Sequence, residues 1–398
     1  MTSCRRAILL VVDGLGVGAL PDADLYGDRG SNTLGNLARA VGGLRIPHLA
    51  SLGLTHCTEV PRSPLLPIPQ LGGAWGIMAP LSPGKETMIG HWELAGVVID
   101  APLDTFPHGF PSWLVAEVER ITGRAVLGNV PASGTVIIAE LGEEHLRTGS
   151  PIVYTSADSV LQVAAHEEVV PPSLLYRWCA EIRAVLDRSP LRVGRVIARP
   201  FAGGAGSFRR TAGRHDWALP PPGTTVLDAL AGRGYQVVGI GKVPDIYAGR
   251  GITTRVPAGG NAEILAALDE AFAGLEQGLI VANLVDFDML YGHRNDVPGY
   301  ARALEQFDGW LGGFLPRLRE TDALTAHQAD MLIVTADHGC DPTTPSTDHS
   351  RELVPVLVAG PRWRERGCLG VRHTLADVAA TIARGFALDW TPTGARPF

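Results

Sequence analysis

Acidic and imidazole side chains follow three short apolar runs of this 398-residue chain. The runs are "ILLVV" (8–12), "IVANLV" (280–285) and "LIVTA" (332–336). Two further histidines come five residues after Asp288 and eleven residues after His338. Carboxylate and imidazole groups are common metal ligands, so the pattern raises the question of metal chemistry. The residues concerned are Asp13, Asp286, Asp288, His293, Asp337, His338 and His349.

Each of these residues alone has a structural explanation. An Asp after a strand is often a turn former or a helix N-cap, and a single His more often makes a structural hydrogen bond. Together, carboxylates clustered at one edge of a sheet would repel one another and be costly to remove from water. One or two divalent cations would relieve this repulsion, so the cluster predicts a metal site.

The ligand types limit the metal and the reaction. Asp and His without Cys favour Mn²⁺, Zn²⁺, Fe²⁺ or Mg²⁺ over a thiolate site, and ligand type does not choose among these ions. Six ligands would divide into three for each of two metals. Two metals about 3.5–4 Å apart hold the attacking and leaving oxygens of an in-line phosphoryl transfer.

Such a transfer needs a nucleophile, and the segment "GKETMIGHWEL" (84–94) offers one in Thr87. A threonine hydroxyl is a weak nucleophile at neutral pH, but a metal ion can lower its pKa and orient it. The segment shows neither a helix face nor strand alternation, and Gly84 and Gly90 bracket the threonine. It predicts an irregular loop that presents the hydroxyl to the metals.

The apolar runs predict parallel strands buried on both faces, because they are β-branched and continuous. We expect strands within 7–13, 235–242, 278–288 and 330–339, and helices within 261–275, 299–315 and 373–386. The last helix opens with Thr374 and Asp377 at the spacing of a capping box. Strand–helix alternation at both ends of the chain predicts one α/β layer, whose ligands would gather at the carboxyl ends of the strands.

The middle of the chain has a different pattern. It contains the runs "TVIIAEL" (135–141), "SPIVYTSAD" (150–158) and "RVGRVIARPF" (192–201), which we expect to be strands, and a helical pattern at 171–186. We therefore expect a discontinuous core formed by 1–100 and 220–398, with a central, mostly parallel sheet flanked by helices. Residues 101–219 would form an inserted α+β cap domain.

Composition narrows the class of protein. A net charge of -7 argues against a nucleic-acid partner. The five scattered cysteines lack CxxC spacing, and the N-terminal apolar run stops at Asp13, short of a signal-peptide core. No stretch has the roughly 18 apolar residues that a membrane helix needs. We expect a soluble, cytoplasmic protein with no obligate protein partner.

Several long segments, in order along nearly the whole chain, resemble the phosphopentomutase family of the alkaline-phosphatase superfamily. They include "DGLGVGALPDA" (13–23), "GKETMIGHWE" (84–93), "YTSADSVLQVAAHEEVVP" (154–171), "GSFRRTAGRHDWAL" (206–219), "NLVDFDMLYGHRNDVPGYARALEQFD" (283–308) and "TADHGCDPTTPSTDHSRE" (335–352). The resemblance implies an alkaline-phosphatase-like core and a two-manganese enzyme. Such an enzyme interconverts ribose 1-phosphate and ribose 5-phosphate, and their 2-deoxy forms, with a sugar bisphosphate as activator.

The resemblance also implies roles for single residues. Asp13, Asp337 and His338 would hold one metal, and Asp288, His293 and His349 the other. Thr87 would be the phosphorylated nucleophile between them, while Asp286 would have a supporting or structural role. The residues implied to bind the pentose and its phosphate are Asp158, Arg195, Arg210 and Lys242.

Independently of the family, the middle segment is rich in arginine, which binds phosphate in bidentate fashion. The arginines are Arg195, Arg199, Arg209, Arg210 and Arg214, and each of them could equally be a solvated surface charge.

Two positions depart from the family pattern, and the reaction has rivals. Ile89 stands where the family usually has Thr, and Gly14 where it commonly has Ser. Since both are expected beside the phosphoryl group, the lost hydroxyls put rate and substrate preference in question. A metal-dependent phosphatase or another phosphosugar mutase of the superfamily is the main alternative, because only the fate of the phosphoenzyme differs. A non-enzymatic phosphosugar sensor is disfavoured, since all six ligands are present.

Overall fold

The computed structural model describes residues 3–60, 72–156, 159–323, 328–364 and 366–398. The chain divides into two compact units. The core unit comprises Met1–Ala101 and Pro221–Phe398, and the inserted unit comprises Pro102–Pro220. Each unit contains its own β-sheet.

The core unit is built on an eight-stranded sheet in the order β10-β9-β11-β1-β12-β13-β2-β14. The strands from β10 to β12 in this order run parallel, β13 is antiparallel to both of its neighbours, and β14 is parallel to β2. The strands are β1 Ser3–Val12, β2 Ala74–Met78, β9 Gln236–Ile240, β10 Thr254–Val256, β11 Gly278–Leu284, β12 Gln328–Thr335, β13 Val354–Ala359 and β14 Gly367–Arg372.

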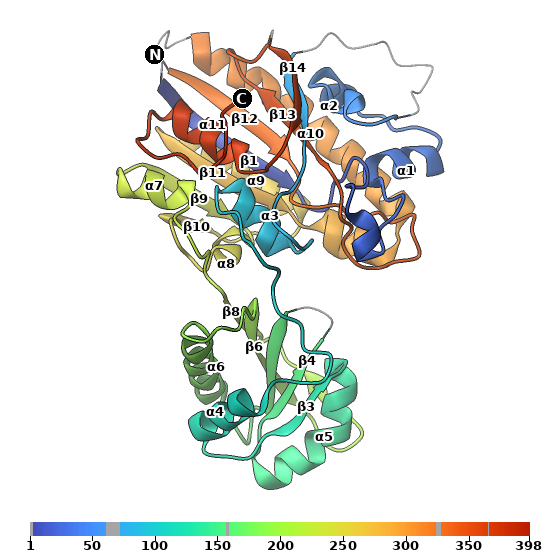
Figure 1. Ribbon diagram of the computed structural model, residues 1–398, viewed down its shortest axis with the longest axis vertical. Coiled ribbons are helices and arrows are strands. Elements are labelled where there is room, and N and C mark those ends of the chain that lie inside the picture. The colour runs from blue at the N-terminus through green and yellow to red at the C-terminus, as the bar shows by residue number, and fades with distance from the viewer. Residues whose placement is uncertain (1–2, 61–71, 157–158, 324–327, 365) are drawn as a thin grey trace. The chain divides into compact units, whose positions relative to one another are not determined.

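Helices cover both faces of this sheet. Figure 1 shows α7 and α11 on one face and α9 and α10 on the other. The predicted central, mostly parallel sheet flanked by helices is therefore confirmed. The long helices are α1 Thr33–Ala40, α3 Thr87–Leu94, α7 Val226–Gly232, α9 Asn261–Gly274, α10 Val297–Ala323 and α11 Asp377–Gly385. The short ones are η1 Ala23–Tyr26, α2 Pro47–Ser51, η2 Leu54–His56, α8 Val243–Ile246, η3 Phe287–Tyr291 and η4 Gly292–Arg294.

None of the helices in the described ranges has both the length and the apolar character needed to cross a membrane.

The strand order brings three chain segments to one edge of the sheet. Strand β1 lies between β11 and β12, and all three run parallel. In the register, Val12 pairs with Leu284 and Val11 pairs with Thr335. The residues that follow these strands therefore emerge side by side, which is why acidic groups far apart in sequence meet.

The predicted capping box of the last helix is wrong. Helix α11 begins at Asp377, and Ala376 occupies its N-cap position without a side-chain hydrogen bond. The hydroxyl of Thr374 instead donates to Glu93 Oε1 (2.8 Å) and accepts from the amide of Ala376 (3.1 Å). Glu93 is fully buried, so its carboxylate requires hydrogen-bond donors, and the Thr374 hydroxyl is one of them.

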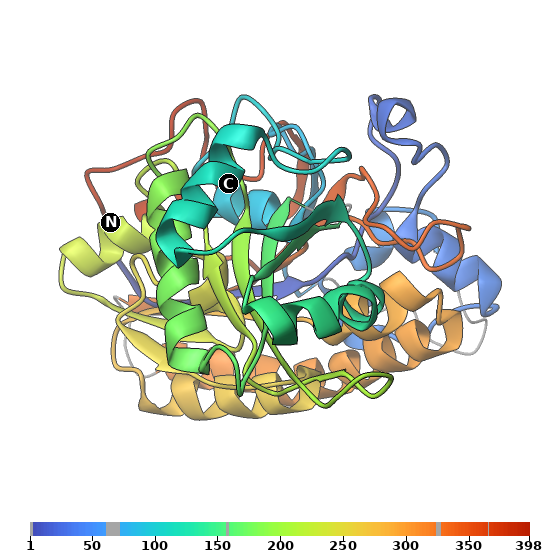
Figure 2. The ribbon, with the colours of Figure 1, turned by 90° about the horizontal axis from the view of Figure 1, so that it is seen from below.

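The inserted unit contains a six-stranded sheet in the order β3-β4-β5-β6-β7, with β8 also pairing with β6. Its parallel and antiparallel pairs alternate across the sheet. Helices α4 and α6 cover one face of the sheet and α5 covers the other (Figure 2). Helices α4 and α6 share one apolar cluster, and α5 packs over a second one. The elements are β3 Leu127–Pro131, β4 Ile152–Thr155, β5 Val160–His166, β6 Arg195–Ala202, β7 Arg209–Arg210, β8 His215–Ala218, α4 Ser112–Thr122, α5 Gly134–Thr148 and α6 Pro172–Leu186.

The segment "TVIIAEL", which we expected to be a strand, lies in helix α5. A short apolar run does not distinguish a strand from a buried helix segment by itself. The longer window does, because the buried positions recur at helical spacing. These positions are Gly134, Ile137, Ile138, Gly142 and His145.

The expected loop around Thr87 is also a helix, α3, and Thr87 is its first residue. Every residue from Met88 to Leu94 is buried. Because no face of the helix meets water, its sequence carries no amphipathic period. Gly90 makes the close packing possible, since a Cβ atom there would lie 2.3 Å from the carbonyl oxygen of Asp337.

We predict that Gly90→Ala destabilises the protein, while Gly309→Ala does not. The added methyl group at position 90 would overlap backbone that follows β12, which costs about 1–3 kcal/mol. Gly309 lies exposed in α10 with nothing within 4 Å of its missing Cβ, so alanine there should stabilise by about 0.5–1 kcal/mol. Denaturant midpoints of the two variants compare them directly, and equal shifts would contradict the assigned packing of α3.

Candidate metal centre

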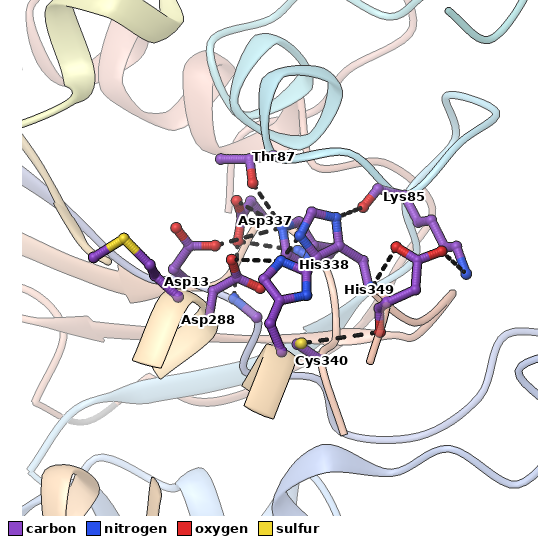
Figure 3. Close-up of polar contacts among 12 residues, drawn as sticks. Asp13, Lys85, Thr87, Asp288, Asp337, His338, Cys340 and His349 are labelled. Carbon is purple, nitrogen blue, oxygen red and sulfur yellow. Dashed lines mark hydrogen bonds and ion pairs between the residues drawn. The ribbon is translucent and has the colours of Figure 1, made fainter. Parts of the chain in front are cut away.

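The acidic residues of the cluster follow the carboxyl ends of the central strands. Asp13 directly follows β1, and Asp337 is the second residue after β12. Asp288 lies in η3, a short π-helical turn that begins three residues after β11. π-Helical turns are rare and frequently occur at functional sites. Figure 3 shows the three carboxylates directed toward His338 and one another.

The residues of the cluster form three groups, and within each group the ligand atoms lie within 4.8 Å of one another. Asp13, Asp337 and His338 form the first group, which is one of the two ligand sets that the family resemblance implies. Asp288 is shared by the other two, once with His338 and His349 and once with His293 and Cys340. All six candidate residues therefore take part in these groups, together with the thiol of Cys340.

Imidazole nitrogens lie against the carboxylate oxygens. His338 Nε2 is 3.4 Å from Asp13 Oδ1 and 3.3 Å from Asp337 Oδ2. Asp288 lies between two rings, with Oδ2 3.1 Å from His293 Nε2 and Oδ1 3.2 Å from His349 Nε2. The rings of His338 and His349 are stacked, with centroids 3.9 Å apart.

The other ring nitrogen of each histidine faces a backbone carbonyl. The Nδ1 atoms of His293, His338 and His349 are 2.6, 3.0 and 2.9 Å from the oxygens of Thr347, Gly339 and Lys85. A carbonyl only accepts hydrogen bonds, so Nδ1 carries a proton and the Nε2 atom of each ring faces the cluster. Metal-binding histidines are oriented in this way.

Several buried atoms of the cluster have no hydrogen-bond partner. They are Asp13 Oδ1, Asp288 Oδ1, Asp337 Oδ2 and His349 Nε2. Leaving such atoms unpaired in the interior is costly. A divalent cation would satisfy oxygens and imidazole nitrogens together, so the residues present fit a metal centre.

The pKa values reflect the same crowding. Burial raises the pKa of Asp13 well above its usual range, and the charges of Asp337 and Asp288 add to this effect. Burial likewise raises the pKa of Asp337 to about 7. Burial also acts to raise the pKa of Asp288, but the imidazoles of His293 and His349, which lie against its two oxygens, outweigh this effect and hold that pKa well below its usual range. Without cations, the cluster cannot keep all of its acids ionised.

Thr87 lies at this cluster. Its Oγ1 is 3.0 Å from His338 Nε2, and the residue is partly exposed. The side chain belongs to the first turn of α3, whose first backbone hydrogen bond runs from the Gly90 amide to the Glu86 carbonyl. The earlier amides of the helix have no partner within it, and such amides favour a bound anion.

Other residues contact the carboxylates of Asp13 and Asp337 and help to fix their positions. Asn283 Nδ2 donates to Asp13 Oδ2 (2.7 Å), and the Gly14 amide donates to Asp337 Oδ1 (3.2 Å). His91 is fully buried with its Nε2 3.7 Å from Asp337 Oδ2. The sequence signal for His91 is its position four residues after Thr87, on the same face of a helix.

Asp286 and Asp288 have different surroundings. The Asp286 carboxylate accepts a hydrogen bond from the Asn261 amide (2.8 Å), and the Asp286 amide donates to Asn261 Oδ1 (3.0 Å). Asp286 thus ties the end of β11 to the start of α9, while Asp288 faces the histidines.

The two departures from the family pattern are both packed. Ile89 lies against Gly84, where a Cβ atom would come within 2.8 Å of Ile89 Cδ1. Gly14 has a φ of +77°, and a Cβ atom there would lie 2.8 Å from Cys340 Cβ. The Gly14 backbone therefore leaves little room for a serine beside Cys340.

The residues expected to bind the sugar lie in both units. Lys242 follows β9 in the core unit, is exposed, and has its Nζ 3.8 Å from Met289 Sδ. In the inserted unit, Arg195 Nη1 lies 3.8 Å from Asp216 Oδ2. Arg210 packs on Gly134 beside the Tyr154 hydroxyl. Asp158 lies outside the described residues.

Comparisons with known proteins show the family of this chain. A family model described as "Metalloenzyme superfamily" matches residues 5–390. A phosphopentomutase of Caldanaerobacter subterraneus subsp. tengcongensis is 53% identical over 390 residues, covering 98% of this chain and 96% of the relative. A phosphopentomutase of Anaeromyxobacter sp. (strain K) is 55% identical over 385 residues, covering 96% of each chain. The chain thus belongs to the phosphopentomutase family of the metalloenzyme superfamily.

Proposed function

We propose that this protein is a phosphopentomutase that interconverts ribose 1-phosphate and ribose 5-phosphate, and their 2-deoxy forms, through a phosphothreonine at Thr87. Near full-length identity of 53% and 55% to phosphopentomutases supports the reaction. The observation that carries the proposal is the 3.0 Å approach of the Thr87 hydroxyl to His338 within the ligand cluster.

We assign two divalent ions to the cluster, with Mn²⁺ as the proposed metal. Asp13, Asp337 and His338 would hold one, and Asp288, His293 and His349 the other. When bound, the ions supply positive charge that activates the hydroxyl and stabilises the attacking and leaving oxygens. The Nδ1 contacts to backbone carbonyls keep each imidazole oriented with Nε2 toward the cluster.

The residues around Thr87 suit a phosphoryl acceptor. The hydroxyl is partly exposed, so a substrate can reach it, while the rest of α3 is buried and holds it still. The unpaired amides of the first turn would favour the negative charge of a phosphoryl group on Thr87.

The reaction exchanges one phosphoryl group in each half. Phospho-Thr87 gives its phosphoryl to the free hydroxyl of a bound pentose monophosphate, so one P–O bond to threonine breaks as one to the sugar forms. The resulting bisphosphate then returns its other phosphoryl to Thr87. A sugar bisphosphate from solution primes any enzyme that has lost its phosphate, which makes it the activator.

We assign recognition of the pentose and its phosphate to Asp158, Arg195, Arg210 and Lys242. Guanidinium groups bind phosphate in bidentate fashion, which suits Arg195 and Arg210. The inserted unit would act as the cap that keeps water from hydrolysing the phosphoenzyme.

The decisive assay follows ribose 1-phosphate with Mn²⁺ and a sugar bisphosphate, measuring ribose 5-phosphate and free phosphate together. We expect ribose 5-phosphate to form with little phosphate release. Rapid phosphate release without ribose 5-phosphate would make the protein a phosphatase.

Thr87→Ala should abolish the formation of ribose 5-phosphate and the release of phosphate, since it removes the nucleophile, and Thr87→Ser should retain part of the activity. Full activity in Thr87→Ala would exclude the phosphothreonine route.

The metal assignment predicts different behaviour for two neighbouring aspartates. In wild-type protein, an ion at 100 times its Kd should add about 2.7 kcal/mol of stability per site. Asp288→Asn should lose the share of one site, because its carboxylate lies between His293 and His349. Asp286→Asn is the matched control and should keep the full gain. Thermal unfolding with and without Mn²⁺ measures the stability gained by each variant. An equal loss of this gain in the two variants would contradict the assignment of Asp288, rather than Asp286, as the metal ligand.

A further inference from the structure

A buried thiol lies in the cluster that holds Asp288. Cys340 is a free cysteine with 1% of its surface exposed, two residues after His338. Its Sγ, a carboxylate oxygen of Asp288 and a ring nitrogen of His293 all lie within 4.8 Å of one another. Figure 3 shows Cys340 next to the labelled ligands.

The position of the sulfur is fixed by backbone contacts from two sides. The Cys340 amide donates to the Gly14 carbonyl (2.8 Å), just after β1. A Cβ atom on Gly14 would come within 2.8 Å of Cys340 Cβ, and one on Gly292 within 2.4 Å of Cys340 Sγ. Glycines on both sides thus leave space for the thiol.

The Cys340 thiol lies within hydrogen-bond reach of the Asp288 carboxylate. Its contact with the Asp348 carbonyl is long, at 3.9 Å. Asp288 is 8% exposed, and its Oδ1 atom has no hydrogen-bond partner. An unpaired carboxylate oxygen, an oriented imidazole and a sulfur at metal-ligand spacing together point to a cation rather than to packing alone.

We propose that Cys340 is a further ligand of the metal centre at Asp288 and His293 when this centre holds a thiophilic ion such as Zn²⁺ or Cd²⁺, and that the sulfur raises the affinity of the centre for such ions. The inference rests on the metal centre of the proposed function. As the S–metal bond forms, the thiol releases its proton to water. Hard ions such as Mg²⁺ and Mn²⁺ gain little from sulfur, so they would use the carboxylate and imidazoles alone.

The chain supplies its own control, since each of its cysteines is free and Cys368 is exposed. Full-length protein, dialysed free of divalent ions, is titrated with Cd²⁺ while near-ultraviolet sulfur-to-cadmium charge-transfer absorption is recorded. Wild type and Cys368→Ser should show the band, and Cys340→Ser should lack it. We expect Cys340→Ser to bind Cd²⁺ about tenfold or more weakly and Mn²⁺ with less than about threefold change. An unchanged band in Cys340→Ser would overturn the proposal.

A second measurement needs no variant. X-ray absorption of the wild-type protein loaded with Zn²⁺ should show sulfur scattering at about 2.3 Å, and a shell of only nitrogen and oxygen at about 2.0–2.2 Å would overturn the proposal. The mutase assay separates this inference from the function on which it rests. Mutase activity without a sulfur ligand removes the Cys340 assignment alone, whereas a sulfur ligand without mutase activity leaves a metal centre of another function.

Discussion

The carboxylates of Asp13, Asp288 and Asp337 are buried within reach of one another at the carboxyl edge of the core sheet. Their repulsion raises the pKa of Asp13 beyond what burial alone would do, and Asp288 stays ionised only because two imidazoles lie against it. The strand order imposes this closeness, since β11, β1 and β12 are neighbours in register. Bound cations would offset this repulsion between the carboxylates, so metal binding would stabilise the fold.

Thr87, the proposed nucleophile, is positioned by the same packing. Gly90 lets α3 lie directly on the backbone of Asp337, which brings Thr87 to His338. The segment before α3 is fastened to the ligand loop, because Arg351 Nη1 donates to the carbonyls of Ser82 (2.7 Å) and Gly84 (2.8 Å). The proposed ligands and the proposed nucleophile are thus held by one network, so a shift in either would disturb the other.

Much of the fold and of the cluster could be predicted from the sequence, for identifiable reasons. Strands such as β1 and β12 are continuous apolar runs, and parallel strands deliver the residues after them to one edge. Helix α3 has no amphipathic pattern in its sequence because almost all of it is buried, and the helical period of α5 does not show in the seven-residue run 135–141. The sequence gives no signal for Cys340, because its spacing to the other cysteines is uninformative and it comes close to Asp288 and His293 only in the folded chain.

The central claim is that two cations bind this cluster beside Thr87. Anomalous diffraction at the manganese edge, from crystals of the full-length protein grown with Mn²⁺, tests it most directly. The account predicts two peaks about 3.5–4 Å apart. One should contact Asp13, Asp337 and His338, the other should contact Asp288, and Thr87 Oγ1 should lie next to both. A single peak, or a pair of peaks away from Thr87, would contradict the account.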